Sequence, residues 1–141
     1  MPVKAAFMLL TVGLLGACQA EADPLVTVSD ARILALPTSA AAYFTLANSG
    51  GRDRLISVDA PGVGQASLHQ TSMNAGIMRM RALPEGIEIP ARGRILLSPS
   101  GRHVMIQGLV RPLAQGSLVQ LKLRFERQGV VAIGAKVGGP Q

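Results

Sequence analysis

Apolar and polar residues alternate along several short segments of this chain, and none carries a convincing 3.6-residue apolar period over helical length. The clearest alternation runs through residues 119–125. Its apolar members are Val119, Leu121, Leu123 and Phe125, and its polar members are Gln120, Lys122, Arg124 and Glu126. Successive side chains of a β-strand point to opposite faces, so this pattern predicts a strand with one buried and one solvated face.

Other short runs of this kind recur between turn-forming residues. Strands are predicted over 25–29, 42–46, 55–58, 77–83, 87–89, 94–97, 103–106, 119–125 and 130–137, and none between 59 and 76. Turn signals include Asn48-Ser49-Gly50-Gly51, Pro61-Gly62 and Ser98-Pro99-Ser100-Gly101. Seven or more short strands at this spacing are typical of an antiparallel β-sandwich or barrel.

Length and composition allow one domain with an aliphatic core. The chain has 141 residues, of which 48% are hydrophobic but only 3% are aromatic, and there is no Trp. Val, Ile, Leu and Ala must therefore fill the interior. We expect the folded domain over residues 23–137 and a frayed tail over 138–141, with no internal repeat.

Residues 1–22 read as an export signal with a short linker. Lys4 precedes an apolar run, 5–15, of signal-peptide length that is too short to span a bilayer. Leu15-Gly16-Ala17-Cys18 resembles a bacterial lipobox, in which Cys18 is lipidated, whereas Ala20-Glu21-Ala22 would serve as an ordinary cleavage site. We favour the lipobox, because Cys18 directly follows the apolar run. The expected location is periplasmic or otherwise extracytoplasmic, with possible lipid anchoring.

Cys18 is the only cysteine, which restricts the chemistry of the mature protein. There can be no disulfide within the chain, no thiolate metal site and no cysteine nucleophile. This composition suits an oxidising compartment, where a thioether is more durable than a thiolate.

The formal net charge is +6, but nucleic acid is not the expected partner. Export argues against it, and the arginines are scattered without aromatic residues between them for base stacking. A solvated strand face explains the charge, and attraction to anionic lipid or to an acidic protein is the alternative.

All histidines and all methionines beyond the N-terminal segment lie between residues 69 and 105. They are His69, Met73, Met78, Met80, His103 and Met105. Thioether and imidazole together form the ligand set of a Cu(I) site, whereas hard cations prefer oxygen. On a strand, His103 and Met105 share one face, as do Met78 and Met80. Two neighbouring strands could present both pairs to one volume, with His69 arriving from the preceding stretch; the alternative is that these side chains only fill the core.

The spacing of these residues resembles that of the periplasmic copper chaperones of the PCu(A)C type. Their signature is a His, ten residues, a Met, twenty-one residues and then His-x-Met. Here ten residues (70–79) separate His69 from Met80, and twenty-two (81–102) separate Met80 from His103. The extra residue is expected in the turn over 82–86, where an insertion need not shift strand register. The similarity extends over residues 26–127 and includes Ala42-Tyr43-Phe44-Thr45-Leu46, Asp53-Arg54-Leu55 and Gly108-Leu109, although the family's common early tryptophan is missing.

The resemblance implies a cupredoxin-like Greek-key β-sandwich that binds one Cu(I). It carries over His69, Met80, His103 and Met105 as ligands, with Met73 and Met78 as auxiliary candidates outside the signature. It also implies copper delivery to the copper A centre of cytochrome c oxidase, alone or with a Sco-type thiol protein.

Other functions remain open on the sequence alone. One alternative is a metal-free envelope scaffold or adhesion module, and another is copper storage or buffering. An enzyme is not expected, because there is no Gly-x-Ser-x-Gly elbow, and Ser72 near His69 lacks a credible acidic third member.

Overall fold

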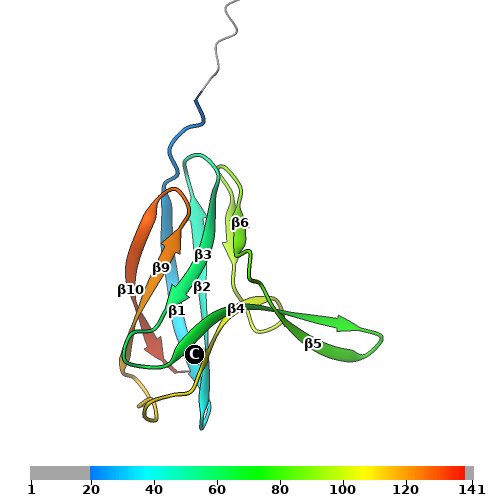
Figure 1. The fold of residues 1–141 in the computed structure, drawn as a ribbon, viewed down its shortest axis with the longest axis vertical. Helices are drawn as coiled ribbons and strands as arrows, with labels where there is room; N and C mark the ends of the chain where they lie inside the picture. Colours follow the sequence, from blue (N-terminus) through cyan, green and yellow to red (C-terminus); the bar gives the residue numbers. More distant parts are fainter. Residues whose placement is uncertain (1–19, 139–141) are drawn as a thin grey trace, which may run out of the picture.

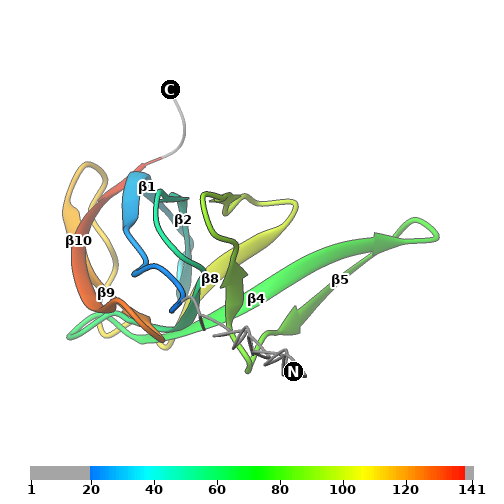
Figure 2. The same cartoon turned by 90° about the horizontal axis from the view of Figure 1, so that it is seen from above.

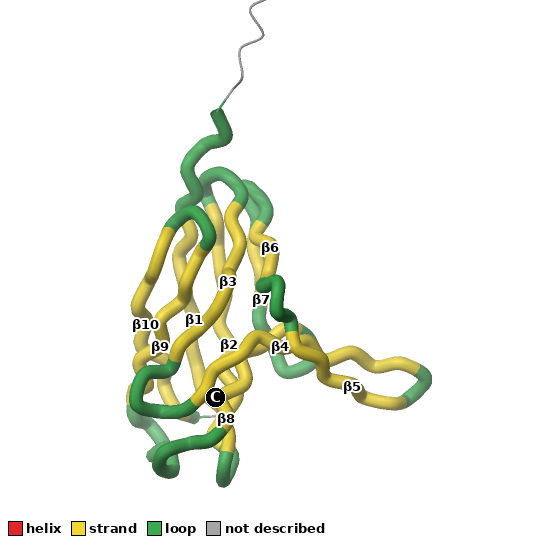
Figure 3. Tube along the Cα trace, viewed as in Figure 1, coloured by secondary structure: helices red, strands yellow, loops and turns green. Residues whose placement is uncertain are grey.

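The computed structural model describes residues 20–138, which form ten β-strands joined by turns (Figure 3). The strands are β1 (Val26–Ala35), β2 (Ser39–Asn48), β3 (Asp53–Asp59), β4 (Gln65–Asn74), β5 (Ile77–Ala82), β6 (Ile87–Ile89), β7 (Arg94–Leu96), β8 (Arg102–Gln107), β9 (Leu118–Phe125) and β10 (Gly129–Val137). Within the described range there is no helix that could cross a membrane. All nine predicted strands are present, several of them longer than predicted. The tenth, β4, was missed.

The strands form one hydrogen-bonded sheet that folds back on itself (Figures 1 and 2). Their order is β5-β4-β8-β2-β1-β10-β9-β3-β6, and β7 pairs separately with β2. Each neighbouring pair in this order is antiparallel except β1 with β10, which is parallel. The predicted all-β sandwich is therefore confirmed, with one parallel pair where its two halves join.

The core lies between the two halves and is mainly aliphatic, as the composition predicts. In β9, Val119, Leu121, Leu123 and Phe125 are buried and the residues between them are exposed. They meet Phe44 and Leu46 of β2 and Leu55 of β3 in one hydrophobic cluster. β2 lies in the middle of its half of the sandwich, where it pairs with β1, β7 and β8. Its side chains are buried on both faces.

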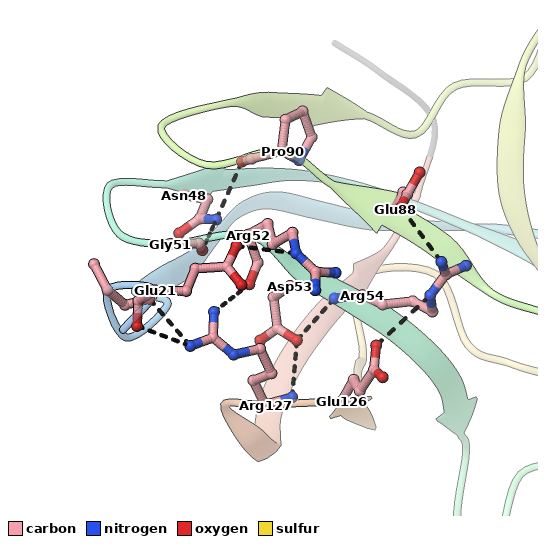
Figure 4. Close-up of polar contacts among 11 residues, drawn as sticks. Glu21, Asn48, Gly51, Arg52, Asp53, Arg54, Glu88, Pro90, Glu126 and Arg127 are labelled. Carbon is pink, nitrogen blue, oxygen red and sulfur yellow. Dashed lines mark hydrogen bonds and ion pairs between the residues drawn. The ribbon is translucent and has the colours of Figure 1, made fainter. Parts of the chain in front are cut away.

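A polar cluster closes one end of the sandwich, around the buried carboxylate of Asp53 (Figure 4). This carboxylate accepts hydrogen bonds from the backbone N–H groups of Arg54 (2.7 Å), Arg127 (2.8 Å) and Gln128 (3.0 Å). The Arg127 guanidinium donates to the carbonyl of Ala22 (3.1 Å), and a Cβ added at Gly51 would clash with that same carbonyl. The segment before β1 thus fits closely against the β2–β3 turn.

The β4–β5 hairpin projects from the sandwich as an arm, which Figure 1 shows beside the body. β8 pairs with β4 only as far as Gln70, so the residues beyond Thr71 pair with β5 alone. The two strands are joined by Ala75 and Gly76, whose φ angles of 52° and 76° are those of a type I′ turn. The candidate ligands lie on this arm and on the neighbouring strand β8.

Candidate metal site

Strand register places the candidate ligands on one face of the three-stranded unit β5–β4–β8. His69 of β4 lies directly opposite His103 of β8. On the other side of β4, Thr71 lies opposite Met80. Because directly opposed residues and alternate residues share a face, Met80 points to the same side as both histidines.

This face is the outer one, away from the core. Leu68 and Val104, which alternate with the histidines along β4 and β8, are buried in the hydrophobic cluster. His103 is nevertheless only 4% exposed. Neighbouring side chains on the outer face therefore cover this imidazole, which is unusual for a residue pointing away from the core.

The hydrogen bonds of His103 orient its ring toward the thioether of Met80. Its Nδ1 lies 3.1 Å from the carbonyl oxygen of Gly101, and an N–H at this position donates to that oxygen. The neutral ring then carries its free lone pair on Nε2, which lies 3.2 Å from the Met80 sulfur. Two lone pairs facing each other are stabilised by a cation between them, so the pair is arranged as two donors to one ion.

The second histidine also has one free ring nitrogen. Nε2 of His69 lies 2.8 Å from the Ser67 hydroxyl, whereas its Nδ1 is buried and has no hydrogen-bond partner. A buried polar atom without a partner is costly and calls for an explanation, and a bound ion is one. Burial, and secondarily the charge of His103, lower the pKa of His69 below its usual 6.5, which favours the neutral form that binds metal.

The two imidazoles lie next to each other, with Tyr43 on the far side of His103. The ring centroids of His69 and His103 are 6.2 Å apart and their planes are inclined by 27°. Tyr43 lies 6.3 Å from His103, centroid to centroid, and the Arg32 guanidinium stands 5.3 Å from the Tyr43 ring centre. Burial raises the pKa of Tyr43 despite the opposing charge of Arg32, so its hydroxyl stays neutral. One side of the site is thus walled by an uncharged aromatic ring.

The other methionines lie on the same face of the three-stranded unit. Met105 follows His103 by two residues and lies opposite Ser67, partly buried. Met73 and Met78 lie opposite each other on the arm and are 67% and 66% exposed. Met80, at 47%, is half exposed.

Two expectations from the sequence are corrected by this arrangement. The strands carrying Met78–Met80 and His103–Met105 are not neighbours, because β4 lies between them and brings His69 on a strand of its own. The alternative that Met78 and Met80 fill the core is wrong, because their side chains are 66% and 47% exposed. A turn does follow β5, which ends at Ala82, and β4 pairs regularly with both β5 and β8; the place of the extra residue stays a prediction.

The donor set of imidazoles and thioethers suits a soft cation. Among residues 20–138 there is no cluster of three or more His, Cys, Asp or Glu side chains able to hold a metal. With bonds of about 2.0 Å to nitrogen and 2.3 Å to sulfur, as zinc makes, donors around a tetrahedral ion lie about 3.5 Å apart. The spacing of His103 Nε2 and Met80 Sδ is close to that value.

Three groups that support the site were not identified from the sequence. Ser67 and the Gly101 carbonyl each bond the ring of a histidine two residues further on, and Tyr43 shields His103. If β4 had been predicted as a strand, the i, i+2 spacing of Ser67 and His69 would have placed the two side chains on one face. No local signal marks Tyr43, which reaches His103 only through the pairing of β2 with β8.

Comparison with known families identifies the family of this chain. Residues 26–137 match the model of the family described as "Putative lipoprotein LpqE-like". The chain belongs to the LpqE-like family. A relative from Leifsonia xyli subsp. xyli, named "Putative lipoprotein Lxx21020", is 33% identical over 102 residues, which are 71% of this chain and 61% of that protein. The chain therefore spans about three fifths of the length of this relative.

Solved structures similar to this LpqE-like chain include PCuAC domains and the protein DR1885. The copper-bound PCuAC domain from PmoF2 has a TM-score of 0.67 at 25% identity, over 82% of this chain and 93% of that one. The Cu(I) form of DR1885 from Deinococcus radiodurans has a TM-score of 0.65 at 30% identity, over 85% of this chain and 82% of that one. The apo form of DR1885 has a TM-score of 0.62 at 29% identity.

These matches confirm the resemblance to PCu(A)C-type chaperones and the cupredoxin-like fold. The family description also agrees with the expected lipoprotein character of the chain. Cys18, the predicted lipidation site, lies outside the described residues.

Proposed function

We propose that this LpqE-like protein binds one Cu(I) through His69, Met80, His103 and Met105 and carries it to an acceptor protein outside the cytoplasm. The observation on which this rests most is the 3.2 Å approach of His103 Nε2 to the Met80 sulfur, with Nδ1 of the same ring held by Gly101. The copper bound by the similar PmoF2 and DR1885 domains supports the same cargo.

The ligand set favours Cu(I) over Cu(II). Two imidazoles and two thioethers are all neutral, so the site keeps a single positive charge, and soft sulfur stabilises the monovalent ion. A blue-copper electron carrier uses a cysteine thiolate, and the only cysteine of this chain is Cys18 in the signal segment. The site is therefore suited to carriage rather than to electron transfer.

Release follows from the unequal exposure of the ligands. His103 is enclosed, whereas Met80 is half exposed on the arm and can leave the ion first. An acceptor that brings thiolates to this side could then replace the thioethers one at a time, because a thiolate is a charged and stronger ligand for Cu(I). The acceptor we propose is the copper A subunit of cytochrome c oxidase or a Sco-type thiol protein.

Copper stoichiometry measured on single variants tests the ligand assignment. Cu(I) is titrated in competition with a chromophoric chelator against the parent protein and against His69→Asn, Met80→Leu, His103→Asn and Met105→Leu. Each substitution should weaken tight binding. Unchanged affinity in all four variants would refute this ligand set. Absence of Cu(I) binding by the parent protein would instead favour a metal-free scaffold or adhesion module, for which the histidines and methionines are packing only.

Delivery is tested separately from binding. Loaded protein is mixed with a reduced Sco-type domain or with the copper A domain, and the copper on each is measured after separation. Failure to transfer to any thiol-bearing acceptor, with tight binding intact, would favour storage or buffering. Mass spectrometry of the mature N-terminus tests the anchor: we expect a lipidated Cys18, and an unmodified start at Asp23 would contradict it.

A further inference from the structure

Three methionines on the outer face of the arm form a continuous line that ends at the candidate copper site. Met73 and Met78 are a directly opposed pair on β4 and β5, and Met80 follows Met78 by two residues. All three therefore share the face that carries His69 and His103. Only Met80 touches the inner cluster, through His103.

The two outer methionines are placed where packing does not explain them. They are 67% and 66% exposed, on the part of the arm that has no third strand beside it. Exposed large apolar side chains gathered on one face mark an interaction site more often than a packing need. Met73 and Met78 are auxiliary candidates by sequence, and in the structure they lie further out along the arm than Met80.

We propose that Met73 and Met78 form a second, outer site for Cu(I), from which the ion passes to Met80 and then to the inner site. Opposed residues on paired strands have Cβ atoms about 4.5–5.5 Å apart. Two sulfurs that share an ion at bonds of about 2.3 Å lie at most about 4.6 Å apart. The three rotatable bonds of each methionine side chain allow both sulfurs to reach one ion without moving the backbone.

The surroundings of the pair select for a soft, weakly charged ion. Residues 65–82 contain no Asp or Glu, so a hard divalent cation would find no carboxylate on the arm. Arg79 and Arg81 alternate with the methionines along β5 and point to the opposite face. A site of two neutral thioethers should bind more weakly than the mixed inner site, as a point of entry requires.

Met80 connects the two sites. It is diagonal to Met73, at the separation of about 7–8 Å that long side chains can bridge. In the transfer, a Cu–S bond to Met80 forms as the Cu–S bond to Met73 or Met78 breaks. A bond to Nε2 of His103 then forms as the remaining outer Cu–S bond breaks. No electron or proton has to move, because all of these ligands are neutral and copper stays monovalent.

The experiment is an anaerobic Cu(I) titration of protein labelled with carbon-13 at the methionine methyl groups, followed by NMR. The first equivalent should shift the methyl signals of Met80 and Met105, and the second should shift those of Met73 and Met78. The double variant Met73→Leu with Met78→Leu should bind one equivalent instead of two, with the affinity of the inner site unchanged. Ile77→Leu, a change on the other face of the same arm, is the matched control and should still bind two.

The outcomes of this titration distinguish the outer site from the inner site of the proposed function. The transfer step rests on the proposed function, whereas copper binding by Met73 and Met78 does not. If Met80 and Met105 shift but Met73 and Met78 do not respond to two equivalents, the outer site is refuted and the inner one stands. If all four shift together with the first equivalent, there is one enlarged site and the proposal is wrong. If no methyl group shifts, both proposals fail, and an apolar docking surface for a protein or lipid becomes the explanation of the arm.

Discussion

His103 and Met80 face each other across β4, with ring nitrogen and sulfur 3.2 Å apart, although they lie on strands that are not paired. The contact is possible because β4 lies between β5 and β8. On β4, Thr71 lies opposite Met80 and His69 lies opposite His103, and neither is a bulky apolar residue that would keep the two side chains apart. The donor atoms of three strands thus meet over the central one. The predictions below follow from this geometry and from the packing that supports it.

Replacing Met80 with Leu should remove a ligand without disturbing the fold. Leu keeps a similar volume but has no sulfur, so Cu(I) affinity should fall by about 100-fold or more, at least as much as loss of an outer-shell partner costs. The urea midpoint of the copper-free protein should hardly change, because the side chain is half exposed. Competition with a Cu(I) chelator measures the affinity, and parental affinity would rule out Met80 as a ligand.

Ser67→Ala should weaken copper binding by acting on His69. The hydroxyl lies 2.8 Å from Nε2 and fixes the ring so that Nδ1 is the free nitrogen. Loss of such a partner typically costs about 10–100-fold in metal affinity. Ser67→Thr keeps the hydroxyl and should restore binding. A positioning role would be excluded if the Ala and Thr variants bound Cu(I) equally well.

Acidification should destabilise the copper-free protein through His69. Its pKa is lowered in the folded state by burial and by His103, so below about pH 6.5 the unfolded chain binds a proton that the folded chain does not. The free energy of unfolding therefore falls as the pH drops through that value, and it stops falling only below the lowered folded pKa. Urea unfolding at several pH values measures this, and His69→Asn should flatten that part of the dependence. Parallel curves for the two proteins would contradict the assignment.

Acidification should also release copper, since protons compete with the ion at both imidazoles, whereas the thioethers do not titrate. Because the pKa of His69 is lowered, its share of the loss should come at lower pH than for an ordinary histidine. Chelator competition from pH 7.5 to 5 follows the effect. An affinity that stays flat over this range would mean that the imidazoles are not ligands.

Asp53→Ala should destabilise the fold far from the copper site. Three backbone N–H groups bond the buried carboxylate, and alanine would leave them without a partner at a cost of about 2–4 kcal/mol. Asp53→Asn keeps one acceptor oxygen and should cost less. Chemical unfolding measures both changes, and copper stoichiometry should stay as in the parent protein. Equal stability of the Ala variant and the parent would show that the cluster is dispensable.

The sequence by itself determined those strands in which apolar and polar residues alternate, because this alternation shows which face is buried. The alternation in 119–125 gives β9 and its buried face, because an apolar period of two has one physical explanation. The metal chemistry was also predicted from the sequence, because all histidines and all methionines beyond the N-terminal segment lie between residues 69 and 105. The candidate ligands His69, Met80 and His103 were predicted from this gathering of His and Met residues in one stretch and from the family resemblance.

Only the tertiary structure decided how those ligands meet. β4 is mostly polar and buries Leu68 alone, so its sequence carries no strand pattern; backbone hydrogen bonds to β5 and β8 on either side hold it extended. The same pairing puts the histidines opposite each other and leaves Met73 and Met78 on a two-stranded arm in solvent. Such relationships depend on which strands become neighbours, and residue alternation within a single strand does not contain that information.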